Sequence, residues 1–371
     1  MPRHTVGRSP LRGPRPVLRG PRPLLRALRT TSASACAVLL AVTALAGCNR
    51  DQGSGAAGGG KVGIDLPRSD SDFWNSYQGY VEKGVTADGI DALPLTNSQN
   101  DIGKLVSNVQ VFTDQGAKAV VMAPQDTGAI AETLRTLSEK KIPVVSVDTR
   151  PDTGDVYMVV RADNRAYGEQ ACQYLGERLK GRGKVAEFQG DLSSINGRDR
   201  SEAFKSCMHR KYPGIRVFEL ATDWKGDVAS AKLQSTLAAH PDINGIYMQA
   251  GGVFLQPTLA LLEQKKLLKA AGTPGHITIV SNDGIPEELD AIRAGKIDAT
   301  VSQPADLYAE YALYWAERAL EGKTPKAGPT DHGSTVIKIP NGFEDQLPAP
   351  LVTKENVDDD KLWANQLEKK S

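Results

Sequence analysis

From Lys61 onward, short apolar runs typical of β-strands alternate with stretches whose spacing favours α-helices. The runs are apolar at consecutive positions, as strands are when helices cover both faces of a parallel sheet. Between two of them, Ile130, Leu134 and Leu137 repeat at the spacing of a helix face. Repeated strand–helix units predict right-handed crossovers and doubly wound α/β sheets. The expected strands lie at 61–66, 90–96, 118–124, 143–149, 155–164, 184–190, 215–222, 243–250, 276–283 and 297–304.

The alternation begins again near residue 155, after a first set of strands. A chain of 371 residues has room for roughly two domains at about 150 residues each. Two tandem α/β halves therefore predict two lobes with a cleft between them. Ligands of open α/β sheets bind beyond the carboxyl ends of the strands, so the residues at the strand ends are the candidates for a site.

The N-terminal region does not follow this pattern. Residues 1–47 hold eight arginines and no acidic residue, and their last part is a short apolar run at 35–47. A membrane-spanning helix needs about 20 apolar residues, so this run is too short. A basic stretch, an apolar stretch and small residues are typical of a signal peptide, which we expect at 1–47. The Gly-rich residues 48–60 are expected to be a flexible tether.

The sequence Leu-Ala-Gly before Cys48 resembles the lipobox of bacterial lipoproteins. The resemblance implies that Cys48 is lipidated, becomes the mature N-terminus and anchors the protein to the outer face of the cell membrane. The alternative is an ordinary buried cysteine that follows a core helix.

The formal net charge of +1 conceals an uneven distribution of charge. Without residues 1–47, the chain has 37 basic and 44 acidic residues, a net charge of −7. An acidic domain is a poor partner for nucleic acid or for an anionic membrane surface. We therefore expect no nucleic-acid partner and attachment to the bilayer through lipid.

Two cysteines remain after the expected processing, Cys172 and Cys207. They lie on expected helices on either side of one strand, and an oxidising compartment permits a disulfide. A Cys172–Cys207 disulfide is our hypothesis, and two free thiols are the alternative.

Aromatic and charged side chains gather at the expected strand ends. Aromatic rings stack on the C–H faces of a sugar, and Asp, Arg and Gln make directional hydrogen bonds to its hydroxyls. Alternatively, the acids cap helices and the aromatics belong to the core, but caps do not require Trp and Arg beside them. The residues are Asp70, Ser71, Asp72, Phe73, Trp74, Asp148, Arg161, Asp163, Asn164, Arg198, Asp223, Trp224, Gln249, Asp283 and Gln303.

From Lys61 to about Lys354 the sequence resembles the periplasmic sugar-binding proteins of the ribose-binding type, which serve ABC importers. The matching strings are PVVSVDT, RADN, GRDRSEAFK, HPDINGIYMQ, VSNDGIPEELDAIRAGKIDATVSQP and LVTKENVD. The resemblance implies two lobes joined by a three-strand hinge, with crossings near Asp163, Gln303 and Thr330. It thus predicts an N-terminal lobe of 61–162 plus 304–330 and a C-terminal lobe of 163–303 plus 331–371.

The resemblance also implies roles for single residues. Phe73 and Trp74 match the paired aromatics of the first loop, and Asp148 matches an acid that binds sugar hydroxyls. Arg198 matches an arginine of the second lobe, and Trp224 matches an aromatic that closes over the ring. Asn164 matches the hinge-region Asn. The predicted ligand-binding set is Ser71, Phe73, Trp74, Asp148, Arg161, Arg198, Trp224, Gln249, Asp283 and Gln303.

Three positions lack an amide that the ribose-binding pattern has. They hold Ser71, Ala123 and, after Gln249, Ala250. These losses put ribose itself in doubt. Extra arginines at Arg150 and Arg161 leave room for a larger, acidic or phosphorylated ligand.

The leading hypothesis is a monomeric, lipid-anchored binding protein that delivers a monosaccharide or polyol to the membrane permease of an ABC importer. It needs no cofactor and no metal. The first alternative is a binder of an anionic or phosphorylated sugar, or of a signalling molecule reported to a sensor.

Two other classes fit less well. A transcription regulator with this core would carry an N-terminal helix-turn-helix, where this chain has the expected signal peptide. For an enzyme, the five histidines show no paired metal-ligand spacing and no GxSxG occurs. Composition alone does not exclude a Ser/His/Asp hydrolase, but no residue is nominated as its nucleophile.

Overall fold

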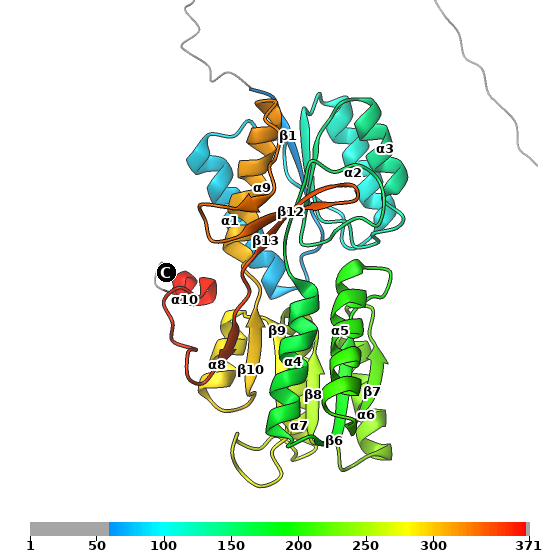
Figure 1. The fold of residues 1–371 in the computed structure, drawn as a ribbon, viewed down its shortest axis with the longest axis vertical. Helices are drawn as coiled ribbons and strands as arrows, with labels where there is room; N and C mark the ends of the chain where they lie inside the picture. Colours follow the sequence, from blue (N-terminus) through cyan, green and yellow to red (C-terminus); the bar gives the residue numbers. More distant parts are fainter. Residues whose placement is uncertain (1–58, 369–371) are drawn as a thin grey trace, which may run out of the picture. The chain divides into compact units, whose positions relative to one another are not determined.

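A computed structural model describes residues 59–368, which hold two α/β lobes (Figure 1). The predicted signal peptide, Cys48 and most of the predicted tether lie outside the described residues. Within 59–368, none of the helices is both long enough and apolar enough to span a bilayer.

The N-terminal lobe contains an eight-stranded sheet in the order β11-β12-β13-β5-β4-β3-β1-β2. Helices α1 and α9 lie on one side of it and α2 and α3 on the other (Figure 1). Neighbouring strand residues face opposite layers: Val121 packs in the cluster with α1 and α9, and Val120 in the cluster with α2 and α3. The strands are Val62–Leu66, Thr96–Asn97, Ala119–Met122, Val144–Val147, Met158–Ala162, Gly328–Pro329, Thr335–Ile339 and Gly342–Leu347 (β1–β5, β11–β13), and the helices are Asp72–Asp88, Ile102–Asp114, Ala131–Glu139 and Ala305–Leu320 (α1–α3, α9).

The C-terminal lobe contains a six-stranded sheet in the order β14-β10-β9-β8-β6-β7, in which only β14 runs antiparallel to its neighbour. Its faces are again covered separately, by α4 and α5 on one side and by α6, α7 and α8 on the other. The predicted fold class is confirmed. The strands are Arg182–Gln189, Gly214–Ala221, Gly245–Met248, Thr278–Asp283, Ala299–Ser302 and Leu351–Thr353 (β6–β10, β14), and the helices are Asn164–Arg178, Ile195–Lys211, Gly226–Ala239, Gly251–Gln264, Pro286–Arg293 and Trp363–Glu368 (α4–α8, α10).

The chain passes between the two sheets after β5, after β10 and after β13. The third passage therefore lies beyond Leu347, and not near Thr330 as predicted. Residues 335–347, assigned to the C-terminal lobe from the sequence, form a β12–β13 hairpin whose second strand pairs in parallel with β5. The hairpin is held there by Asp345, a fully buried acid that accepts a 2.9 Å hydrogen bond from Trp315 Nε1 on α9.

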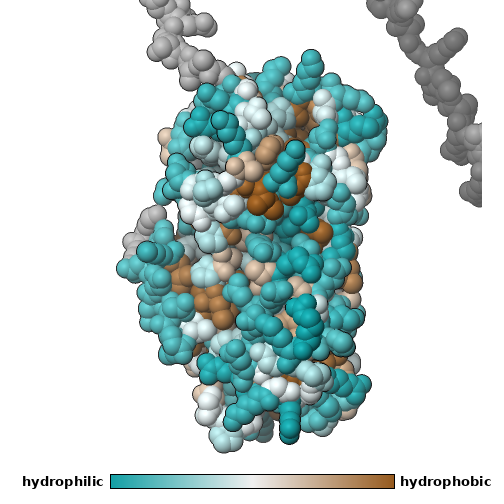
Figure 2. Space-filling view, in the orientation of Figure 1, coloured by the Kyte–Doolittle hydropathy of each residue, from teal (hydrophilic) through white to brown (hydrophobic). Residues whose placement is uncertain are grey.

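Most of the surface seen in Figure 2 is hydrophilic, with a few separate apolar patches. Among the described residues the exposed large apolar side chains are Val106, Val111, Leu192 and Tyr314. The remaining large apolar side chains are at least partly buried, most of them in the layers between sheets and helices.

A disulfide joins Cys172 on α4 to Cys207 on α5, and their Cα atoms lie 6.1 Å apart. The two helices approach closely at Gly168, where a Cβ atom would lie 2.3 Å from the carbonyl oxygen of Arg200. The bond therefore fixes the helix layer that carries Arg200, a residue of the candidate site described below.

We expect the double variant Cys172→Ala/Cys207→Ala to unfold about 5–10 °C below the wild type, because loss of a disulfide of this loop length costs about 2–4 kcal/mol. Scanning calorimetry with and without reductant measures the effect. Reductant should lower the Tm of the wild type and leave that of the variant unchanged. Two free thiols in the denatured, unreduced mature protein would contradict the bond.

Candidate ligand-binding site

A cavity lies between the two lobes, where loops after strands of both sheets meet. Seven of the ten predicted ligand residues line it: Ser71, Phe73, Trp74, Asp148, Trp224, Asp283 and Gln303. The cavity also has lining residues that the sequence reasoning did not single out as ligand contacts: Arg68, Gln125, Asn196, Arg200, Ala250 and Val253.

The guanidinium group of Arg200 is the central cation of the cavity. It is 3% exposed and donates to Asn164 Oδ1 at 2.6 Å and to Gln303 Oε1 at 2.8 Å. A third hydrogen bond goes to the carbonyl oxygen of Gln249. The group also lies over the rings of Tyr167 and Trp224, 5.0 and 5.7 Å from their centroids. These contacts fix Arg200 in one orientation. Asn164, the expected hinge residue, is one of the acceptors that hold it.

Two buried acids, Asp148 and Asp283, face the cavity from opposite lobes. Asp148 Oδ2 accepts a 2.8 Å hydrogen bond from the Asn196 amide, whereas Oδ1 is buried with no partner among the described residues. Asp283 Oδ2 accepts from the backbone N–H of Gly252 at 2.8 Å. Both residues have positive φ, 63° and 114°, a backbone conformation that is strained for a non-glycine residue and that recurs at functional sites.

Burial raises the pKa of both acids, and the charge of Arg200 opposes that rise. The pKa of Asp283 reaches about 7. Behind it, Glu288 accepts hydrogen bonds from the N–H groups of Gly284 and Ile285. Burial and the neighbouring Asp283 raise the pKa of Glu288 to about 8. The acid of the C-terminal lobe is therefore costly to ionise in the unliganded protein.

Three aromatic residues supply the apolar part of the cavity. Phe73 and Trp74 pack edge to face, with centroids 5.2 Å apart. Trp224 is 7% exposed, and its Nε1 is buried without a partner among residues 59–368. Its ring lies so close to Gly190 that a Cβ there would be 2.0 Å from it. The ring is thus held against the β6 strand end.

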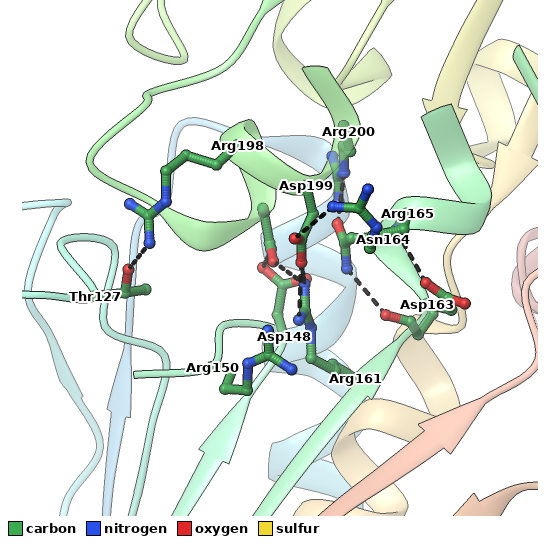
Figure 3. A network of polar contacts seen from close by, with 12 residues as sticks. Thr127, Asp148, Arg150, Arg161, Asp163, Asn164, Arg165, Arg198, Asp199 and Arg200 are labelled. Carbon is green, nitrogen blue, oxygen red and sulfur yellow. Dashed lines mark hydrogen bonds and ion pairs between the residues drawn. The ribbon is translucent and has the colours of Figure 1, made fainter. Parts of the chain in front are cut away.

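Three predicted ligand residues do not line the cavity: Arg161, Arg198 and Gln249. Gln249 is fully buried, and its amide donates to Glu187 and Ser201. Arg161 donates to Asn196 and to Asp199, and the contact with Asp199 is visible in Figure 3.

Arg198 does not line the cavity; it contacts Thr127 (Figure 3) and pairs with Asp152. The second-lobe arginine in the cavity is Arg200, two positions further on. Asn196 and Arg200 are four residues apart on α5 and share a helix face, whereas Arg198 lies on another face. That helical spacing is the signal in the sequence that identifies Arg200 instead of Arg198.

The two arginines that motivated an acidic ligand are paired within the protein. Arg150 lies 3.4 Å from Glu344, and Arg161 lies 3.2 Å from Asp199. The charged residues that line the cavity are Arg68, Arg200, Asp148 and Asp283, two of each sign. The cavity therefore carries no formal excess of positive charge when both acids are ionised.

The family described as periplasmic binding protein domain matches residues 62–324. The ribose import binding protein of Salmonella typhimurium is 28% identical over 239 residues, which are 63% of this chain and 76% of that protein. The xylitol-binding protein of Mycolicibacterium smegmatis is 27% identical over 71% of this chain and 68% of its own length.

A solved structure of an ABC transporter solute-binding protein from Mycobacterium smegmatis, with bound glycerol, superposes with a TM-score of 0.70. It is 24% identical and covers 81% of this chain and 96% of its own. The curated relatives are binding proteins of importers and not enzymes. The match over most of the chain and the two-lobed fold together show that this protein belongs to the periplasmic binding protein domain family, with the ribose import binding proteins among its homologues.

Proposed function

We propose that this protein is a lipid-anchored, extracytoplasmic binding protein that captures a neutral monosaccharide or polyol and delivers it, as a monomer, to the permease of an ABC importer. The names of its relatives support the ligand class, since they include binding proteins for ribose and xylitol. The lipobox-like sequence at Cys48 supports the lipid anchor.

The observation that carries the ligand class is a pair of unpartnered polar atoms at the cavity. Asp148 Oδ1 is a buried acceptor and Trp224 Nε1 is a buried donor, and neither has a partner among the described residues. Each such atom costs about 1–3 kcal/mol while it has no partner. A hydroxyl group both donates and accepts, so a polyhydroxylated ligand can satisfy both atoms while its C–H face contacts the indole ring.

The charge of the cavity favours a neutral ligand over an anionic one. Arg68 and Arg200 face two acids that a phosphate or carboxylate would have to approach. Arg68 is already bonded to Asp70, and it also donates to the carbonyl oxygen of Trp224 at 3.3 Å. A negatively charged ligand would therefore find both arginines already committed to partners within the protein, and it would meet repulsion from either acid that is ionised.

Ligand entry requires movement. The cavity volume is about 40 Å³, which is space for a few water molecules and too small for a sugar ring. Its walls come from both lobes, which the three interlobe passages and the contacts across the interface join within residues 59–368. We infer that the lobes separate about these passages to admit the ligand, by the hinge motion that closes other two-lobed proteins.

A ligand screen on the mature protein tests the proposal. We expect calorimetry and thermal shift to detect at least one of the neutral pentoses, hexoses, pentitols or inositols, with an affinity that stays constant between 50 and about 500 mM salt. Sugar phosphates serve as the comparison. Binding of the phosphorylated compounds alone, with an affinity that falls steeply with salt, would contradict a neutral ligand.

Removal of the indole ring should weaken binding. We expect Trp224→Ala to lower affinity by about 1–3 kcal/mol, through lost stacking area, for any sugar that the wild type binds. Tyr314→Ala, which removes an exposed aromatic of α9, is the matched control and should bind as the wild type does. Wild-type affinity in Trp224→Ala would remove this residue from the site.

The buried Asp283 should make stability depend on pH. Its ordinary pKa of 3.8 is raised to about 7 by burial, so the folded protein retains a proton that the unfolded chain releases. The stability present at low pH is then lost as pH rises through about 7. We expect Asp283→Asn to raise the Tm of the unliganded protein by a few degrees, with a gain that grows from pH 5 to about 7 and then levels.

Scanning calorimetry across this pH range measures the gain in Tm, and the same variant should bind sugar more weakly. A Tm difference that is independent of pH would contradict the ionisation cost assigned to Asp283.

A further inference from the structure

Ser193, in the loop before α5, and Arg198, on α5, contact the opposite lobe without lining the cavity. The carbonyl oxygen of Ser193 accepts hydrogen bonds from the backbone N–H of Thr127 at 3.3 Å and from its hydroxyl at 3.1 Å. Thr127 belongs to the loop after β3 in the N-terminal lobe. These bonds therefore form only when the lobes are in contact.

Arg198 strengthens the same contact with a charge pair. One nitrogen of its guanidinium, Nη1, donates to the carbonyl oxygens of Leu192 and Ser193, at 3.0 and 2.9 Å. The guanidinium donates across the interface to the Thr127 hydroxyl at 3.2 Å (Figure 3). It also donates to the carboxylate of Asp152. The exposures of the two charged side chains, 29% for Arg198 and 36% for Asp152, show that solvent screens the pair only partly.

Residues of the first turns of α5 connect this contact to Asp148, the acid that lines the cavity. Asn196 donates to Asp148 Oδ2 and accepts a 2.7 Å hydrogen bond from Arg161. Arg161, on β5, also pairs with Asp199. Lobe contact thus orients Asp148, and the interlobe interface is continuous from Asp152 to the cavity.

We propose that Ser193 and Arg198, with Thr127 and Asp152 of the opposite lobe, form a latch that holds the lobes together through contacts within the protein, and so changes the affinity for every ligand by one common factor. This inference rests on the proposed function for its binding measurements. Because the latch bonds form when the lobes close and break when they open, they favour closure around any ligand by the same free energy. Because Arg198, Asp152 and Thr127 do not line the cavity, weakening their contacts changes that free energy and leaves the ligand contacts in place.

The latch is tested by breaking the Arg198–Asp152 pair. We expect Arg198→Ala and Asp152→Ala each to weaken binding about two- to fivefold, the range for a partly exposed ion pair. The factor should be the same for every member of a panel of D-ribose, D-allose, xylitol and myo-inositol that the wild type binds. The double alanine variant should lose little more than either single variant, and the reversed pair, Arg198→Asp with Asp152→Arg, should regain part of the loss.

A matched control lies on the same helix. Lys205 pairs with Glu219 within the C-terminal lobe at 2.9 Å, so Lys205→Ala removes an α5 ion pair without touching the interlobe contact. Its affinities should equal those of the wild type. A loss in Arg198→Ala that is confined to one sugar, or that Lys205→Ala matches, would overturn the latch.

A second measurement needs no ligand. Small-angle scattering of the unliganded mature protein should show a larger radius of gyration for Arg198→Ala than for the wild type and for Lys205→Ala. An unchanged radius of gyration would overturn the proposal. If no sugar in the panel binds the wild type, the proposed function fails while this scattering comparison still decides whether the latch exists.

Discussion

The site depends on one buried cation, the guanidinium of Arg200. A charge removed from water must be paired and hydrogen-bonded, or it destabilises the fold by several kcal/mol. The acceptors of Arg200 come from three separate parts of the chain: Asn164 at the start of α4, the carbonyl oxygen of Gln249 after β8, and Gln303 after β10. Asn164 and Gln303 stand beside two of the three interlobe passages, so satisfying this charge also fixes the passages beside the cavity.

Arg200 also explains why two buried acids are tolerated at the site. Burial raises the pKa of Asp148 and of Asp283, and the nearby guanidinium partly offsets this effect for both. Two further features raise the free energy of the folded, unliganded state. They are the positive φ angles of the two acids and the buried Asp148 Oδ1, which has no hydrogen bond among the described residues. Costs of this kind are expected where a site is preorganised for a ligand. A polyhydroxylated ligand would recover part of that cost as binding free energy.

Much of this arrangement follows from the sequence. Consecutive apolar positions in the strands were sufficient to predict doubly wound sheets, because helices must cover both faces of such strands. The position of residues at strand ends located most of the cavity lining, since those ends meet at one edge of each sheet. The exchange of Arg198 for Arg200 was missed because a motif alone does not say which face of α5 lines the cavity.

The third passage was predicted too early because residues 335–347 were assigned by resemblance. The β12–β13 hairpin lies in the N-terminal sheet because β13 pairs with β5, and Asp345 of β13 also bonds Trp315 of α9; both partners are far from it in the chain. Long-range pairs of this kind leave no local signal in a single sequence. The Arg161 contacts with Asn196 and Asp199 are another example, in which an expected ligand residue instead holds the residues behind the site.

The most direct test of the account is a crystal structure of the mature protein with the neutral sugar or polyol that binds it most tightly. The account predicts that the ligand lies between the lobes, with a hydroxyl group within hydrogen-bond distance of Asp148 Oδ1, a second one near Asp283, and a C–H face on the Trp224 ring. A ligand bound outside this cavity, or bound in it without contact to either acid, would contradict the account.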